Sequence, residues 1–518
     1  SSLALRLAQP SLRARALVLR SDAVDQRGNA TLALELLEQA YFVANANDLE
    51  LLAINTSQQM APTHASLGHN EQALRWLEIA EAEAKRASRV EVQPHMLAAI
   101  RARTYMHLGR YDDAHREADA ALADLRADDT SVGYTRLMVI STLAAILTLK
   151  GVPAQERLPV TQERLELSLK LYGPEHPDVA VAYEDMATIH SETGGHSKAI
   201  EMLERARAIH IGVTGPDNLN LVALDNKLAT NQQALGNLDD AEASYRRALE
   251  TQSILRTPTS SSQINLESNL GTLLQQRGKS REALRHQERA LTLSEEAFGS
   301  NGIKTAMVRL NLADVLSNFE DTRRGIVMLE AAGVAFEQGL PQRHPAVVLT
   351  ALSLSLAYIR AGRLDDAETA LSKARSVSGD DPMSAGHLAA VSATLLEAQG
   401  ATEQAIERSG ECVEFLSEKP GYIERLKCLH RASRLLLETG RRDAAYGLLQ
   451  PELGAIRAST ADPRVRAHLL ETLARSEHDP AAARELASEA LKYTDGTDGG
   501  DVAALRGRLE ARLRRNTP

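Results

Sequence analysis

Small apolar residues recur along the chain at a fixed distance after a glycine. A Gly-x-x-x-x-Ala step appears nine times, most copies have a second alanine seven residues after the first, and a large apolar residue commonly stands between the two. Residues spaced by three, four and seven lie on one face of an α-helix. The pattern therefore predicts a helix that begins after a tight turn and packs closely on a partner helix. The nine steps are Gly28/Ala33, Gly68/Ala73, Gly109/Ala114, Gly194/Ala199, Gly236/Ala241, Gly278/Ala283, Gly362/Ala367, Gly400/Ala405 and Gly440/Ala445.

The spacing of these steps defines a repeat. Ala199, Ala241 and Ala283 are 42 residues apart, and other gaps fit units of 38 to 43 residues once degenerate copies near Glu156 and Gly325 are included. A period of this length is typical of helical repeats, in which each unit buries its apolar face against its neighbours. We therefore expect an all-α fold, a right-handed α-solenoid of about twelve helix-turn-helix repeats.

The regularity of the repeat varies along the chain and predicts three regions. Residues 1–160 hold repeats that end in a unit interrupted by Pro153 and Pro159, where we expect a kink or a re-phased helix. Residues 161–380 hold regular 42-residue units. Residues 381–518 hold degenerate repeats and a capping helix.

Loops that contain glycine and His-Pro separate several units, as in "YGPEHPDVA" at 172–180 and "GLPQRHPAVV" at 339–348. Glycine suits the left-handed position that ends a helix, and proline suits the first turn of the next helix. His176 and His344 are accordingly predicted to be loop residues rather than metal ligands, because neither has a second ligand at metal spacing. The glycines expected in left-handed positions are Gly173, Gly215, Gly299 and Gly339.

Within this frame the chain resembles the tetratricopeptide repeat family. The Leu-Gly/Ala step of that family stands at Leu228-Ala229, Leu270-Gly271 and Leu312-Ala313, and its second-helix signature is seen in "YRRALE" at 245–250 and "ERALTL" at 288–293. The 42-residue unit exceeds the usual 34 and is similar to kinesin-light-chain-type repeats. The resemblance implies a solenoid that binds a protein or peptide.

A second resemblance concerns the opening at 9–46 and the following "EQALRWLEIAEAEAKR". It is similar to the C-terminal repeat arm of bacterial serine/threonine kinases. This implies a bacterial signalling protein whose catalytic domain, a kinase or another enzyme such as an ATPase or a caspase-like protease, lies outside these residues. The first residue is Ser1, so we expect a piece of a longer protein.

Composition narrows the function classes. Hydrophobic residues make up 43% of the chain but aromatic residues only 3%, so alanine and leucine must form the core. The net charge of −10 gives no reason to expect a nucleic-acid partner.

No run of apolar residues is long enough to span a membrane. The two cysteines, Cys412 and Cys428, are too few to make a disulfide framework in so long a chain. A cytoplasmic location is expected first, with the extracytoplasmic side of an anchored parent as the alternative. The oligomeric state is not indicated.

The sequence gives little sign of catalysis. Gly278-Lys279-Ser280 resembles the end of a phosphate-binding loop, but Leu273 stands where the first glycine is required. The elbow, zinc and kinase motifs are absent. We therefore predict no catalytic residue, no cofactor and no metal site in these 518 residues.

The predicted function is that of a non-catalytic interaction scaffold or sensor module, which binds a protein or peptide on its concave face. Side-chain amides in register every 42 residues on the first helix of each unit can bind a peptide backbone. The equal alternative is that these residues are only solvated. In the 349–360 unit, Leu349, Leu352, Leu356 and Ile359 form either a docking pocket or tighter packing, with packing favoured. The predicted groove residues are Glu184, Asp185, Asn226, Lys227, Gln233, Asn269, Thr272, Gln276, Asn311 and Asp314.

Overall fold

The helices follow the predicted repeat from one end of the described chain to the other. The structure, a computed structural model, describes residues 9–25, 29–86, 94–127, 133–255, 261–319, 321–379, 381–459, 462–495, 497 and 502–515. Within these ranges the chain forms α-helices and two short 3-10 turns, with no strand. The all-α solenoid prediction is confirmed.

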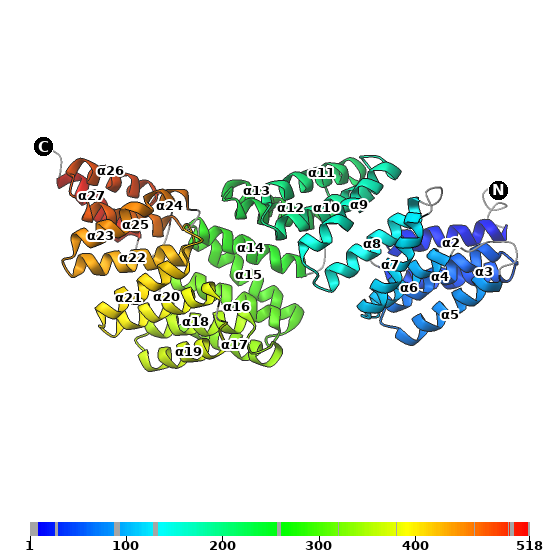
Figure 1. Ribbon diagram of the computed structural model, residues 1–518, viewed down its shortest axis with the longest axis horizontal. Helices are drawn as coiled ribbons and strands as arrows, with labels where there is room; N and C mark the ends of the chain where they lie inside the picture. Colours follow the sequence, from blue (N-terminus) through cyan, green and yellow to red (C-terminus); the bar gives the residue numbers. More distant parts are fainter. Residues whose placement is uncertain are drawn as a thin grey trace. The chain divides into compact units, whose positions relative to one another are not determined.

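The contacts divide the chain into two compact units, unit 1 (Ser1–Gly215) and unit 2 (Pro216–Pro518). Unit 1 stacks five antiparallel helix pairs (Figure 1). They are α2 (Pro10–Asp25) with α3 (Ala30–Asn45), α4 (Glu50–Ser66) with α5 (Asn70–Arg86), α6 (Pro94–His107) with α7 (Tyr111–Ala127), α8 (Gly133–Leu149) with α9 (Ala154–Tyr172), and α10 (Pro177–Glu192) with α11 (His196–Thr214).

Unit 2 stacks seven further pairs and ends in a single helix, so the described residues hold twelve pairs in total. The pairs are α12 (Leu219–Ala234) with α13 (Leu238–Leu255), α14 (Ser261–Gln276) with α15 (Ser280–Phe298), α16 (Ile303–Leu316) with α17 (Thr322–Gly339), α18 (Pro345–Arg360) with α19 (Leu364–Val377), α20 (Pro382–Ala398) with α21 (Thr402–Phe415), α22 (Ile423–Glu438) with α23 (Arg442–Leu449), and α25 (Pro463–Ser476) with α26 (Pro480–Lys492). Between α23 and α25 lie the turn η2 (Gln450–Glu452) and the short helix α24 (Leu453–Ala458), the turn η1 (Ser317–Phe319) follows α16, and α27 (Val502–Arg515) ends the array. The predicted boundaries at 160 and 380 mark changes in repeat regularity, which this division does not test.

The two alanine positions explain why each pair packs so closely. The first alanines, from Ala33 to Ala445, and the second alanines, from Ala40 to Ala490, are each at most 1% exposed. A methyl group is the largest side chain that the contact between the two helices accepts, since interiors are close-packed. The glycines that precede the first alanines, from Gly68 to Gly440, have positive φ angles of 73° to 82°. They occupy the left-handed turn that reverses the chain between helices.

Ion pairs join the second helices of neighbouring units. Lys279 Nζ lies 2.9 Å from Glu242 Oε2, Arg324 Nη1 lies 2.8 Å from Glu288 Oε1, and Arg441 Nη2 lies 2.8 Å from Glu403 Oε1. Each such pair contributes roughly 0.2–1 kcal/mol because it is partly exposed to water. Lys279 therefore lies at the start of α15 and pairs with a second helix of the preceding unit. This role accounts for the Gly278-Lys279-Ser280 step that resembles the end of a phosphate-binding loop.

Most of the predicted helix ends are observed. His176 and His344 cap α10 and α18, and Nδ1 of each ring accepts a hydrogen bond of 3.2 Å from the backbone N–H two residues later. The prediction for Gly339 is wrong, because this residue is the last residue of α17 and lacks a positive φ. A Cβ atom there would lie 2.8 Å from Ile303 Cδ1, so close packing against α16 explains the glycine.

The proline-interrupted unit is less disturbed than expected. Pro153 lies just before the first residue of α9, where no helical N–H is needed, and Pro159 lies inside the helix. The helix nevertheless continues to Tyr172.

In the 345–360 helix, Leu352 is 4% exposed and packs with Leu356 and Ile359, whereas Leu349 is 48% exposed, so packing accounts for most of that apolar stretch.

Candidate partner-binding groove

The predicted amide residues of unit 2 lie in register on α12, α14 and α16. Asn269 Nδ2 donates to Asn226 Oδ1 at 3.1 Å, and Gln233 Nε2 donates to Gln276 Oε1 at 2.9 Å. Asn311 Nδ2 donates to Ser268 Oγ at 3.0 Å. Each of these bonds joins residues 43 positions apart. We call Asn226, Gln233, Asn269, Gln276 and Asn311 the amide ladder.

The amide ladder is therefore partly satisfied within the protein. A primary amide offers two donors and an acceptor with two lone pairs, and Gln233 Oε1 also accepts from the Tyr245 hydroxyl at 3.5 Å. The ladder also fixes the spacing of the first helices, because each link spans two neighbouring units. These residues consequently have a structural role that the sequence did not reveal, alongside the binding role that remains a prediction.

The acidic residues predicted in unit 1 are held by basic neighbours. Glu184 Oε1 lies 3.3 Å from Nε2 of the buried His210, and Asp185 forms an ion pair with Arg164. Both acids lie on α10. Both carboxylates already have partners within unit 1, so they are weaker candidates for partner contacts than the polar residues of unit 2.

A cavity of about 1320 Å³ opens on the first-helix side of unit 2. Its walls come from α14, α16, α18, α22 and α25, together with the turn at 419–422. Three predicted groove residues line it, namely Thr272, Gln276 and Asp314. We call this space the unit 2 cavity. Its volume exceeds the roughly 300–1000 Å³ of pockets that hold small molecules.

The wall formed by α22 and α25 was missed by the sequence reasoning. It contributes Glu424, Lys427, Arg464 and His468. A signal was present for His468, which lies 15 residues before Ala483, the distance at which Asn226 precedes Ala241. Lys427 lies 18 residues before Ala445, outside the offsets of the predicted groove residues. The weak repeat signature after residue 381 concealed it.

Charged groups of both signs face the unit 2 cavity. Lys427 Nζ lies 2.8 Å from Glu424 Oε1, and Arg464 Nε donates to Asp462 Oδ2 at 2.9 Å. Burial would lower the pKa of Lys427, but Glu424 and Asp314 raise it above its usual value. Burial would likewise raise the pKa of Glu424, yet Lys427 lowers it. Both groups are therefore charged at neutral pH.

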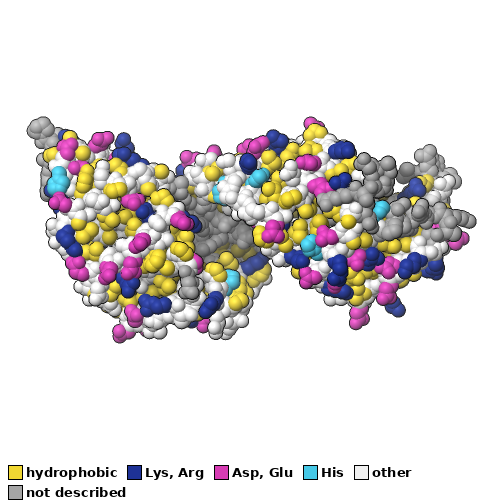
Figure 2. Space-filling view, viewed as in Figure 1, with side chains coloured by type: hydrophobic (Ala, Val, Ile, Leu, Met, Phe, Trp, Pro, Cys, Tyr) yellow, Lys and Arg dark blue, Asp and Glu magenta, His cyan; other side chains and the backbone are white. Residues whose placement is uncertain are grey.

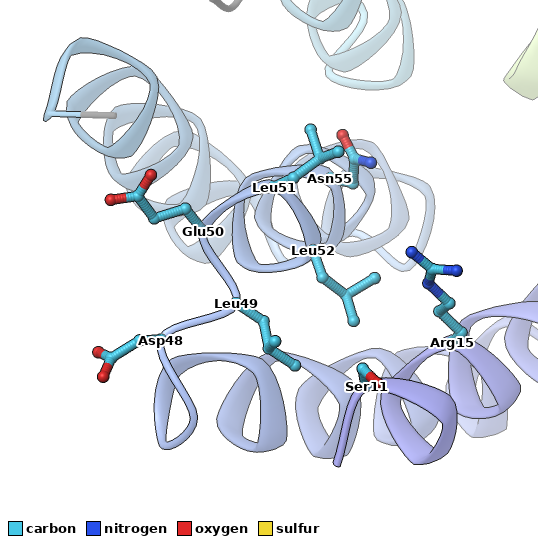
Figure 3. A pocket seen from close by; sticks show the side chains of 8 residues that line it. All are labelled: Ser11, Arg15, Asp48, Leu49, Glu50, Leu51, Leu52 and Asn55. Carbon is cyan, nitrogen blue, oxygen red and sulfur yellow. The ribbon is translucent and has the colours of Figure 1, made fainter. Parts of the chain in front are cut away.

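The rest of the surface offers weaker candidates. Figure 2 shows basic and acidic side chains intermixed over the displayed face, without a region of single charge. A smaller cavity of about 300 Å³ lies in unit 1, where Leu49 and Leu52 face Ser11 and Arg15 of α2 (Figure 3). Within the described ranges, no three His, Cys, Asp or Glu side chains gather as a metal site, and no helix has the length and hydropathy to cross a bilayer.

Helix pairs, glycine turns and a first-helix groove define an α-solenoid of helix-turn-helix repeats. The sequence profile of the tetratricopeptide repeat family matches residues 161–211 and 262–332. These two stretches match the family that the first resemblance named, and they include α10, α15 and α16.

Curated relatives are fungal. The "Clustered mitochondria protein homolog" of Coccidioides immitis is 26% identical over 164 residues, and that of Aspergillus oryzae is 25% identical over 164 residues. Each match covers 32% of this chain and 13% of the relative. The prediction of a bacterial, kinase-associated protein is wrong on this comparison, because the curated relatives described here are fungal clustered mitochondria proteins.

Solved structures with similar folds include yeast Tom70, which is 16% identical with a TM-score of 0.41 and covers 98% of this chain and 97% of Tom70. RapI is 12% identical with a TM-score of 0.46, over 78% of this chain and 97% of RapI. A protein of Podosopora anserina described as having "kinesin light chain nearly identical TPR-like repeats" is 20% identical with a TM-score of 0.35, over 39% of this chain and 96% of that protein.

Proposed function

We propose that the chain is a non-catalytic scaffold that binds an extended segment of a protein partner in the unit 2 cavity. The observation that supports this most directly is the convergence of first helices from five helix pairs on one polar-lined space. Grooves of this kind present side chains from successive repeats along a bound chain.

The chemistry of the lining suits a peptide backbone. Thr272, Gln275 and Gln276 offer hydroxyl and amide groups that both donate and accept. Gln275 Nε2 donates to Asp314 Oδ2 at 2.7 Å, so these groups are already oriented by neighbours within unit 2. Preorganised groups of this kind lose little entropy on binding. The Lys427–Glu424 pair adds one charge of each sign for side chains of the partner.

The test is selection of peptides from a random 12-residue phage-displayed library on immobilised 1–518. Synthetic copies of the enriched peptides are then titrated against the parent protein and two variants. Lys427→Ala removes a lysine that is 48% exposed and ion-paired inside the cavity. Lys373→Ala is the matched control, since Lys373 is 46% exposed and paired with Glu337 on the second helices.

We expect the peptides to bind the Lys427→Ala variant at least about tenfold more weakly than the parent. They should bind the Lys373→Ala variant with unchanged affinity. Equal affinity for all three proteins would place binding elsewhere, and the absence of enriched peptides would contradict peptide binding itself. A triple variant, Asn226→Ala with Asn269→Ala and Asn311→Ala, tests whether the amide ladder contributes, after circular dichroism has shown that it is folded.

A further inference from the structure

One stretch of the chain contributes an unusually large part of the unit 2 cavity. Seven of its twenty lining residues lie between positions 419 and 427. We call residues 416–427 the rim segment. It comprises the turn after α21 and the first part of α22. The seven lining residues are Lys419, Pro420, Gly421, Tyr422, Ile423, Glu424 and Lys427.

A disulfide closes a ring around this rim segment. Cys412 on α21 and Cys428 on α22 are bonded across a sequence separation of 16 residues, and all seven lining residues lie inside the ring. Both cysteines are 0% exposed, and they are the only two in the 518 residues. The disulfide between the only two cysteines thus encloses one wall of the unit 2 cavity.

Apolar packing beneath the rim segment differs between its two ends. Its first residue, Leu416, lies in the small core cluster of the two cysteines, whose other buried members are Ala389 and Ala390 and against which Tyr422 packs. Leu426, near its other end, lies in a cluster of fourteen buried residues around α22, α25 and α26, against which Ile423 packs. Small side chains bury little area and stabilise correspondingly little, so the disulfide reinforces the end of the rim segment where packing is weaker.

Polar contacts hold the rim segment in its present conformation. Arg425 Nη1 donates to the carbonyl of Pro420 at 3.2 Å, and Ser459 Oγ donates to the carbonyl of Gly421 at 2.7 Å. The Tyr422 hydroxyl lies 2.9 Å from His387 Nε2. Arg425 Nε also donates to the carbonyl of Val413 on α21 at 3.3 Å, so this contact joins the same two helices as the disulfide.

We propose that Cys412 and Cys428 form a thiol–disulfide modification site that sets the conformation of the cavity rim. The co-reactant is a low-molecular-weight thiol of the glutathione class. One thiolate attacks a cysteine sulfur and forms a mixed disulfide, and a second thiolate releases it. Two external thiols are oxidised to one external disulfide, while the protein gains two thiol protons and its disulfide is reduced to two thiols.

The reduced state can remain folded. Cys412 Sγ lies 3.9 Å from the backbone carbonyl of Glu424, so the thiol formed there has an acceptor at hand. Reagents reach the buried sulfurs through local opening of the rim segment at its first end, where the small cysteine cluster packs. The redox state then acts on the same atoms that line the cavity, and only this last consequence rests on the proposed function.

Hydrogen–deuterium exchange of the full chain, oxidised and then reduced with dithiothreitol, tests the proposal. Reduction changes no atom other than the bond and its two protons, so side-chain volume is matched. We expect backbone exchange in residues 416–423 to accelerate by at least about tenfold on reduction, with exchange in α25 unchanged. Iodoacetamide labelling under denaturing conditions confirms zero thiols before reduction and two after it.

A Cys412→Ser, Cys428→Ser double variant should exchange rapidly at 416–423 with or without dithiothreitol. Identical exchange in both redox states of the parent would overturn the proposal. Loss of protection throughout α20, α21 and α22 would also overturn it, because the bond would then be a structural staple rather than a control of the rim. Peptide titration in both redox states is a separate arm: if no peptide binds, the proposed function fails while the exchange result still decides the redox inference.

Discussion

Replacing Ala248 by leucine tests the close approach of helices that underlies every unit. Ala248 on α13 is 0% exposed and belongs to the core cluster with Ala229, Tyr245 and Leu270. Leucine adds three carbon atoms where a methyl group already fills the space, and overpacking of this kind costs about 1–3 kcal/mol. We expect the free energy of unfolding to fall by that amount.

The matched control is Ala243→Leu, which places the same side chain on the exposed face of the same helix. Its effect should stay within about 0.5 kcal/mol. Urea unfolding followed by circular dichroism measures both, and hydrogen exchange of α12 to α15 reports damage that stays local to these units. Equal stability of the two variants would refute the assigned helix face.

Three further predictions concern charged groups. Burial, with His468 and Arg434 nearby, lowers the pKa of His430 to about 3, so the unfolded chain binds a proton that the folded chain does not. Stability should fall as pH decreases from 6.5 to 4.5, by up to about 1.4 kcal/mol per pH unit from this group, and urea titrations of a His430→Gln variant should show a shallower fall. Glu452→Gln should cost about 1–3 kcal/mol at pH 7, because Arg425 donates to both carboxylate oxygens at 2.7 and 2.8 Å. The hydrogen bonds from Arg425 lower the pKa of Glu452. This stabilisation is therefore present above about pH 4.3 and is lost as pH falls through the lower pKa of the folded state. If the decrease in stability at acidic pH were the same in the parent and the Glu452→Gln variant, this reasoning would be contradicted. Lys279→Ala should cost less than about 1 kcal/mol, since Arg277 and Arg246 also pair with Glu242, and calorimetry should detect no ATP binding that the substitution removes.

The helix pairs could be predicted because their determinants are local. In most units a glycine with positive φ and an alanine five residues later set the turn and the close helix contact, as Gly236 and Ala241 illustrate. The prediction for Gly339 failed because the reason for this glycine is not local. Its requirement comes from Ile303 on the preceding helix, which no local pattern records.

The unit 2 cavity could be predicted only in part. The register of Thr272, Gln276 and Asp314 followed from the period, but the opposite wall depends on how far successive pairs rotate. That rotation is a sum of small steps over many units and has no signature in any one of them.

The positions of the two cysteines in the sequence gave an indication of the disulfide. Cys412 and Cys428 stand eight residues on either side of Pro420, one residue past the centre of the turn between α21 and α22. Residues equidistant from the turn of an antiparallel pair lie at the same height, where a disulfide is possible. The pairing of Cys412 with Cys428 can therefore be inferred only when the ends of α21 and α22 are known.

The ion pairs between second helices share one direction at three places. Glu242, Glu288 and Glu403 belong to the earlier helix, and their partners Lys279, Arg324 and Arg441 belong to the beginning of the later one. At the junction of α13 and α15 a further pair, Arg246 with Glu282 at 2.9 Å, runs in the opposite direction, and a copy inserted in the same orientation preserves both kinds of pair. An array of this kind can lengthen or shorten in evolution by whole hairpins, as long as each new copy is inserted head to tail.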